Sequence, residues 1–237
     1  MRKTLLTALL TAVALVAGAQ PDKGTLSLIP KVGLTMANMT GSDLSFTGSD
    51  GDIGADSKYQ AGFTAGAELD YQALHWASVS LGVMYYRQGC KYDDVAVVGT
   101  QDEDNVYYTL HTGMKNDMQY INVPLMFNFY PLRNFAIKVG AQLDIPIYTK
   151  ETRETVSMTV DRDTDMKTYS DDFTREKTNV ESNYKEVGVS VPVGISYEYE
   201  NVIIDFRYNI GISDICKSET QRNQVFALTV GYRIKFN

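Results

Sequence analysis

Hydrophobic residues occupy every second position in long stretches of this chain. In the clearest stretch, VGVSVPVGISYEY at 187–199, the seven odd positions are apolar and the six even positions are glycine, serine, proline or glutamate. A period of two is typical of a β-strand with one apolar and one polar face. Strands in globular proteins average about 5–6 residues, whereas a tilted strand that crosses a bilayer needs roughly 9–11. The stretch therefore predicts a membrane-spanning strand.

Seven further stretches alternate in the same way. They cover about 25–37, 59–71, 79–85, 121–129, 135–147, 202–212 and 226–236. Short connections follow the second, fourth and sixth strands, at 72–75, 130–134 and 200–201. Longer polar connections follow the first, third, fifth and seventh, at 41–57, 89–117, 148–185 and 213–223.

An even number of strands, with short turns at one end and long loops at the other, is typical of outer-membrane barrels. Closure also pairs every backbone group inside lipid. The pattern therefore predicts an all-β fold, an eight-stranded antiparallel up-and-down transmembrane β-barrel. The short turns and both ends of the mature chain are expected on the periplasmic side.

Aromatic residues are expected to form a belt at each end of the barrel, because tyrosine and tryptophan favour membrane interfaces. The belt at the short turns would contain Tyr71, Trp76, Phe129, Tyr130, Phe135, Tyr197, Tyr199 and Phe236, and the belt at the long loops Tyr59, Tyr85, Tyr86, Tyr120 and Tyr148.

The first 19 residues have the features of a secretory signal peptide. Arg2 and Lys3 precede the apolar run TLLTALLTAVALVAG, and the small residues of Ala17–Ala19 form a cleavage site. We expect export through the Sec pathway, and a barrel domain covering residues 20–237. Removing Arg2 and Lys3 lowers 22 basic residues to 20 against 29 acidic ones, a net charge of −9. This charge argues against a nucleic-acid partner.

Three prolines lie inside predicted strands, on the polar parity: Pro124, Pro146 and Pro192. Proline cannot donate to a β-ladder, and a closed barrel has no free edge to accommodate it. We therefore expect a bulge or broken pairing at each of the three.

Several strands resemble those of a known family. YINVPLMFNFY at 120–130 resembles the Tyr–aliphatic–x–Ile/Val–Pro–Leu strand of the PorT-like outer-membrane β-barrel family of Bacteroidetes. RYNIGISDI resembles that family's seventh strand, and FALTVGYRIKF resembles its closing strand, which ends in an aromatic residue for recognition by the barrel-assembly machinery. The resemblance covers about 24–237 and implies an outer-membrane location. It also implies contact with the assembly machinery and with membrane lipid, and a role beside secretion or envelope proteins.

The polar parity would carry charges into the lumen. These are Lys31, Lys138, Arg207, Arg233 and Lys235 against Glu68, Asp70, Asp144, Glu198 and Asp205. An eight-stranded barrel is just wide enough for its own side chains, and buried charges need partners. The five charges of each sign predict a neutralised network and a plugged lumen. A narrow porin-like channel is one alternative. A soluble lipocalin-type ligand binder, with its apolar parity turned inward, is another.

Little in the sequence indicates catalysis or a cofactor. His111 lies in the second long loop near acidic residues, but no serine or acidic pair is positioned beside it by a strand, so a solvated loop residue is expected. The acidic run DRDTD at 161–165 has Met166 where an EF-hand needs glycine, which rules out that motif. We therefore expect no enzyme activity, no metal site and no cofactor. The chain is predicted to be a monomeric structural or adhesive component, or an accessory of an envelope complex.

Two features concern the long loops. Cys90 and Cys216 lie at or in the second and fourth loops, and a disulfide between them would fold these loops over the barrel mouth. The third loop contains TVSMTV at 155–160, which alternates weakly and indicates that the strands continue above the membrane as a hairpin.

Overall fold

The computed structural model describes residues 22–41, 44–179, 185–217 and 220–236, which are almost entirely β-structure. The predicted signal peptide lies outside the described residues. The strands are β1 (Leu26–Thr40), β2 (Leu44–Gly48), β3 (Gly51–Ala55), β4 (Ser57–Leu74), β5 (Ala77–Tyr92), β6 (Val95–Gln101), β7 (Asn105–Leu132), β8 (Phe135–Asp161), β9 (Lys167–Asn179), β10 (Gly188–Tyr199), β11 (Val202–Gly211), β12 (Arg222–Tyr232) and β13 (Ile234–Phe236).

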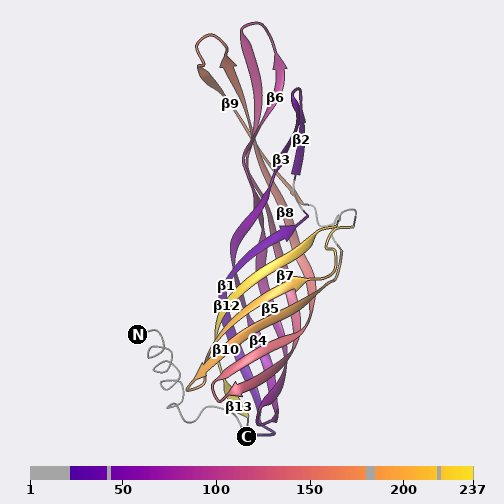
Figure 1. The fold of residues 1–237 in the computed structure, drawn as a ribbon, viewed down its shortest axis with the longest axis vertical. Coiled ribbons are helices and arrows are strands. Elements are labelled where there is room, and N and C mark those ends of the chain that lie inside the picture. Colours follow the sequence, from indigo (N-terminus) through magenta and orange to yellow (C-terminus); the bar gives the residue numbers. More distant parts are fainter. Residues whose placement is uncertain (1–21, 42–43, 180–184, 218–219, 237) are drawn as a thin grey trace, which may run out of the picture.

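Eight of these strands form a closed antiparallel ring. Pairing leads from β1 through β4, β5, β7, β8, β10, β11 and β12 and returns to β1. The short strand β13 continues the β12 edge along β1. The predicted up-and-down barrel is confirmed, and it forms the lower part of the molecule in Figure 1.

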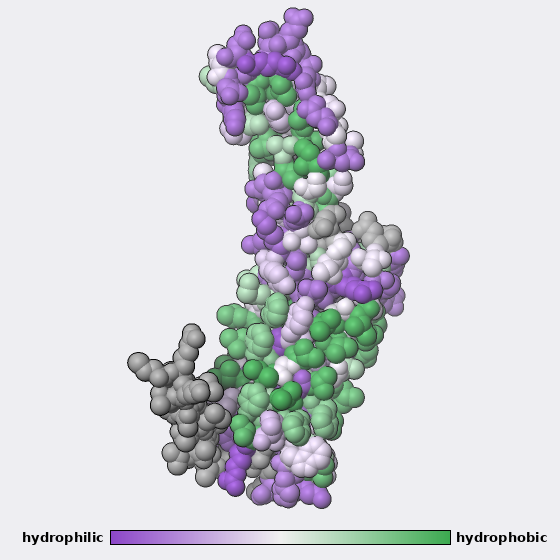
Figure 2. Space-filling view, in the orientation of Figure 1, coloured by the Kyte–Doolittle hydropathy of each residue, from purple (hydrophilic) through white to green (hydrophobic). Residues whose placement is uncertain are grey.

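The two faces of the wall differ as the alternation predicts. Large apolar side chains on the outer face are strongly exposed, for example Leu34 (70%), Val83 (58%) and Leu125 (51%). On the face seen in Figure 2, hydrophobic side chains form a band across the barrel, with hydrophilic side chains at the lower rim. Polar side chains of the other parity are buried inside. The lipocalin-type alternative is wrong, because it requires the apolar parity to face inward.

Short turns connect the strands at one end of the barrel. The connection between β10 and β11 consists of Glu200 and Asn201, and both have positive φ, 48° and 78°. Two left-handed residues make the type I′ geometry that matches the twist of a two-residue hairpin. The strands are thereby held at close spacing on this side.

At the other end, the predicted long loops are mostly strands. β7 has 28 residues and β8 has 27, whereas a tilted strand crosses a bilayer with roughly 9–11. They continue above the barrel flanked by β6 and β9, and β2 and β3 form a further hairpin (Figure 1). The hairpin expected in the third loop is confirmed. The loop expected at 89–117 is wrong, because backbone pairing between β6, β7 and β8 continues through most of it.

The prolines interrupt the ladders as predicted. Pro124 pairs with β8 through Gln142, but its pairing with β5 is interrupted. Pro192 pairs with β11 through Asn209, while its pairing with β8 is interrupted. Each proline lacks one N–H and therefore breaks one ladder while keeping the other.

Pro146 lies at a bulge. Gln119 pairs with Tyr148 and Tyr120 pairs with Pro146, so β8 contains one extra residue here. The bulge shifts the parity of β8, and Thr149, an odd residue, is fully buried above it. The predicted irregularity is thus confirmed at all three prolines.

The aromatic belts are smaller than expected. Tyr71, Trp76 and Tyr199 are each half exposed near the short turns. Tyr86, Tyr120 and Tyr130, however, were predicted for the belts and point into the barrel, with 1%, 1% and 9% exposure. They lie on the inward parity of β5 and β7, and the alternation decides their direction.

The tips of the long hairpins are built alike and bonded together. Asp102 Oδ1 accepts hydrogen bonds from the backbone amides of Asp104 and Asn105, and Asp161 Oδ1 accepts them from Asp163 and Thr164. These Asx turns end the β6–β7 and β8–β9 hairpins. A further bond runs from the Arg162 amide to the Asp104 carbonyl, at 2.8 Å, and joins the two tips.

Acid should loosen these tips. Backbone donors, first those of Asn105 and Thr164, hold the pKa of Asp102 and of Asp161 below the ordinary value. A lowered folded-state pKa means that the stabilisation is present above the unfolded value of about 3.9 and is lost as the pH falls through the folded value.

The amide NMR shifts of Asn105 and Thr164 should therefore titrate with midpoints below the ordinary carboxyl value. Asp102→Asn, which keeps the acceptor oxygen but cannot ionise, should abolish the titration at Asn105 and leave that at Thr164. A midpoint at or above the ordinary carboxyl value would contradict this account.

Candidate functional site

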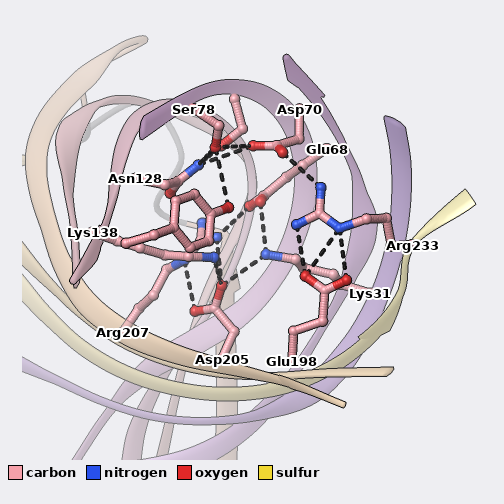
Figure 3. Close-up of polar contacts among 12 residues, drawn as sticks. Lys31, Glu68, Asp70, Ser78, Asn128, Lys138, Glu198, Asp205, Arg207 and Arg233 are labelled. Atoms are coloured by element: carbon pink, nitrogen blue, oxygen red, sulfur yellow. Dashed lines mark hydrogen bonds and ion pairs between the residues drawn. The ribbon is translucent and has the colours of Figure 1, made fainter. Parts of the chain in front are cut away.

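The lumen contains an ion-pair cluster centred on Asp205. The ammonium groups of Lys31 and Lys138 lie 2.8 Å and 2.6 Å from Asp205 Oδ2, and Arg207 Nη2 lies 2.9 Å from the same oxygen. All four side chains are at least 94% buried. Three strands of the wall, β1, β8 and β11, supply these residues because each places its polar parity inward (Figure 3).

Glu68 of β4 joins this cluster from another side. Its carboxylate lies 2.7 Å from Lys31 Nζ and 2.6 Å from Arg207 Nη2. The cluster thus contains three cations and two carboxylates. Because charges out of water require close partners, these contacts offset the desolvation of each member.

A second cluster is centred on Arg233. Its guanidinium lies 2.7 Å from Asp70 Oδ2 and 3.0 Å from Glu198 Oε2. Asp70 also accepts hydrogen bonds from Ser78 Oγ (2.6 Å) and Asn128 Nδ2 (3.0 Å). This cluster contains one cation, Arg233, and two carboxylates. The two clusters together therefore have four positive and four negative charges.

Two predicted members lie outside these clusters. Asp144 is 6% exposed and accepts a 2.6 Å hydrogen bond from Gln142 Nε2, but no cation pairs with it among the described residues. Lys235 was predicted to face the lumen and is exposed. It lies in β13 at the rim, where the wall ends and the alternation no longer separates lumen from lipid.

The lumen near the long hairpins is filled by apolar side chains instead of charges. Met39, Met84 and Met118 are 0–1% exposed, and they form one cluster with Tyr86 and Tyr120. Asn223 Nδ2 donates to the Tyr120 hydroxyl at 3.2 Å. The hairpin of β2 and β3 packs against the same cluster through Leu44, Phe46 and Ile53.

Five side chains of this cluster, Met39, Met84, Tyr86, Met118 and Tyr120, are called the apolar plug below. The charge pattern along the strands did not predict these residues as a cluster. The available signal was the parity of β7, where methionines at even positions share the inward face with Asn122 and Asn128.

Comparison with known proteins identifies the family. Residues 19–217 match the family described as "Outer membrane protein beta-barrel domain". The chain belongs to this family. No curated protein sequence matches it.

Solved structures with a similar fold include Ail, the attachment invasion locus protein of Yersinia pestis, at 12% identity over 90% of this chain and 99% of that chain, with a TM-score of 0.43. OprG from Pseudomonas aeruginosa is 12% identical over 93% of this chain and 100% of its own, with a TM-score of 0.37. AlkL is also 12% identical, over 93% of this chain and 95% of its own, with a TM-score of 0.39.

His111 of this outer-membrane barrel protein is not a solvated loop residue. It lies in β7, stacked on Phe46 with ring centroids 4.5 Å apart. Burial, and then the positive charge of Arg153, lower its pKa. Arg153 also lies over the Phe46 ring. These contacts hold the β2–β3 hairpin against the β7–β8 sheet.

Neither a metal-binding group of side chains nor a membrane-spanning helix is present in the described part of the chain. No group of three or more histidine, cysteine and acidic residues there is arranged to hold a metal ion. No helix there is long and apolar enough to cross a membrane.

The predicted disulfide is not formed in the structure. Cys90 and Cys216 are both buried in the cluster that contains the apolar plug. The Cys90 thiol lies 3.6 Å from Met39 Sδ, and the Cys216 thiol lies 3.1 Å from Gln221 Oε1. Each sulfur thus contacts a different residue.

The two buried aspartates should respond oppositely to neutralisation. Asp205→Asn leaves Lys31, Lys138 and Arg207 short of a counter-charge, and breaking such buried pairs costs about 3–5 kcal/mol. Asp144→Asn keeps an acceptor for Gln142 and removes a buried charge that has no cation, so stability should be unchanged or higher.

Urea unfolding in lipid vesicles, followed by the heat-modifiable shift on a gel, measures both changes. Lys235→Gln at the exposed rim is the control and should stay within about 0.5 kcal/mol of the parent. Equal losses for Asp144→Asn and Asp205→Asn would show that ion pairing does not distinguish the two sites.

Proposed function

We propose that this protein is a closed, non-enzymatic outer-membrane barrel that carries a rigid extension for binding a partner. We call this extension, the sheet of β6, β7, β8 and β9 above the barrel, the recognition stalk. The observation that carries the proposal is the filled lumen, with two ion-pair clusters in one part and the apolar plug in the other. Side chains that are 0–8% exposed occupy the interior from Arg233 and Asp70 to Met39 and Cys90. No solute would pass through such a barrel, and the function would therefore lie in the parts outside it.

The long hairpins support a role in recognition. β6, β7, β8 and β9 form a sheet that continues beyond the hydrophobic band. Its distal side chains include exposed apolar residues in or beside β9: Met166 (65%), Tyr169 (58%) and Phe173 (53%). Exposed aromatic residues on an edge strand outside the membrane are typical of protein contacts. The partner class that fits is an envelope or cell-surface protein.

We further infer that the short turns face the periplasm and the hairpins the outside, after export through the Sec pathway. Short periplasmic turns and long outer loops are general in outer-membrane barrels. A relation to the PorT-like barrels, and with it an accessory role in secretion, is part of this proposal. It rests on the strand motifs at 120–130 and 226–236.

Conductance tests the closed lumen. Purified protein inserted in planar bilayers should give no large, stable single-channel steps, because the buried side chains of both ion-pair clusters and of the apolar plug occupy the lumen. A general porin inserted under the same conditions is the positive control. Stable steps of porin size from this protein would favour the channel alternative over a closed barrel.

Crosslinking tests the recognition stalk. Tyr169→Ser combined with Phe173→Ser should abolish crosslinks from the stalk to an envelope protein in intact cells, without changing barrel folding. Thr168→Ala combined with Thr174→Ala, in the same strand and also exposed, is the matched control and should leave the crosslinks intact. The partner is identified by mass spectrometry. Crosslinks that survive the aromatic replacements would place the contact elsewhere.

A further inference from the structure

A groove with an excess of positive charge lies where the long strands leave the barrel. Its volume is about 410 Å³, and β5, β7, β8 and β9 line it. The cations that line it are Arg87, Lys115, Lys150, Arg175 and Lys177, against the two carboxylates of Asp117 and Glu154. The groove therefore has a net charge of +3 in a chain whose net charge is −7.

The strand register brings these side chains together. Arg87 is opposite Gln119, and Asp117 is opposite Lys150. On the outer edge, Lys177 is opposite Thr152 and Arg175 is opposite Glu154. Opposite residues of antiparallel strands share one face of a sheet. The neighbours of Asp117 in β7, Asn116 and Met118, are buried on the other face.

The carboxylates neutralise only part of this charge. Asp117 lies 3.0 Å from Lys115 Nζ and 3.5 Å from Arg87 Nη2, and Glu154 pairs with Arg175. Among the described residues, no ion pair involves Lys150 or Lys177. These two ammonium groups are therefore the ones available to an anion.

The groove begins at the edge of the hydrophobic band. Ile147, 45% exposed, precedes Tyr148, which lines the groove, and Lys150 follows two residues later. Three residues of a strand tilted by about 35–45° correspond to a rise of roughly 7–8 Å along the membrane normal. The headgroup layer adds roughly 5–7 Å to each side of the hydrocarbon core. Lys150 is thus at the outer edge of the headgroup layer, and Lys177, which is opposite Thr152, lines the same groove just above it.

We propose that this groove binds the phosphate groups of a phosphorylated glycolipid in the outer leaflet. Lysine and arginine provide the charged donors that phosphate oxygens accept, and the adjoining apolar wall lies against the acyl chains of the same lipid. A free phosphate ion would gain nothing from that wall. The location in the outer leaflet rests on the orientation given under Proposed function, whereas the chemistry of binding does not.

The test uses the full-length protein in detergent, where neither orientation nor conductance affects the result. The probes are bisphosphorylated lipid A, the same lipid without phosphates, and inorganic phosphate, with binding measured by native mass spectrometry. The phosphorylated lipid should bind at least ~10-fold more tightly than the dephosphorylated one, since one charge-assisted hydrogen bond contributes about 1.5–3 kcal/mol and 1.4 kcal/mol is tenfold.

Lys150→Gln combined with Lys177→Gln should weaken binding of the phosphorylated lipid at least ~10-fold, for the same reason. The matched control removes two lysines elsewhere outside the band, Lys58→Gln with Lys167→Gln, and should change binding less than ~2-fold, because these side chains do not line the groove. Heat-modifiable migration verifies that both variants are folded.

Three results would overturn the proposal. They are equal binding of the two lipids, equal weakening by the control pair, and competition by inorganic phosphate at the lipid's own concentration. The last result would indicate a free-anion site. None of these results bears on the filled lumen or on the protein partner of the stalk.

Discussion

Every backbone N–H and C=O inside the hydrocarbon layer must find its partner within the protein, and this requirement determines the rest of the structure. The ring meets it by pairing β1 with β12 and β13, so the first and last strands complete the wall. A closed ring has no edge strand, so a proline in it always removes a hydrogen bond from a ladder. Pro124 and Pro192 each give up pairing on one side, and Pro146 sits at a bulge.

Closure with eight strands also makes the lumen narrow, just wide enough for its own side chains, and groups buried there need packing or charge partners. Two different kinds of filling meet this need. Around Asp205 and Arg233, opposite charges from five strands and from Arg233 itself lie within about 3 Å of one another. Near the hairpins, methionine and tyrosine fill the space. The charged part is sensitive to the loss of any one partner, while the apolar part depends on volume.

In the proposed function the lumen is closed, and the long hairpins are the parts that meet a partner. β7 and β8 continue from the barrel wall into the stalk, and the bonded tips at Asp104 and Arg162 and the stack of His111 on Phe46 hold neighbouring hairpins together. The stalk is thus an extension of the barrel's own hydrogen bonding. This gives a rigid support to the exposed side chains of β9 and to the cationic groove at its base.

Local alternation by itself determined the eight barrel strands, their inward and outward faces, and which ends of the barrel have the short and the long connections. A period of two is a property of the backbone, so Asp205 and Arg207 could be assigned to the lumen without coordinates. The sequence also predicted where the prolines interrupt the ladders, because the missing N–H is a property of the proline residue itself.

Only the tertiary structure decided which inward residues meet. Register around the ring brings Lys31, Glu68, Lys138, Asp205 and Arg207 together and leaves Asp144 apart with Gln142, and no spacing along one strand carries that information. The same holds for the apolar plug, the separate contacts of Cys90 and Cys216, and the groove, whose charges come from four strands. Polar sequence at 89–117 predicted a loop, but pairing with neighbouring strands made it β-structure, since ladder hydrogen bonds do not require an apolar face.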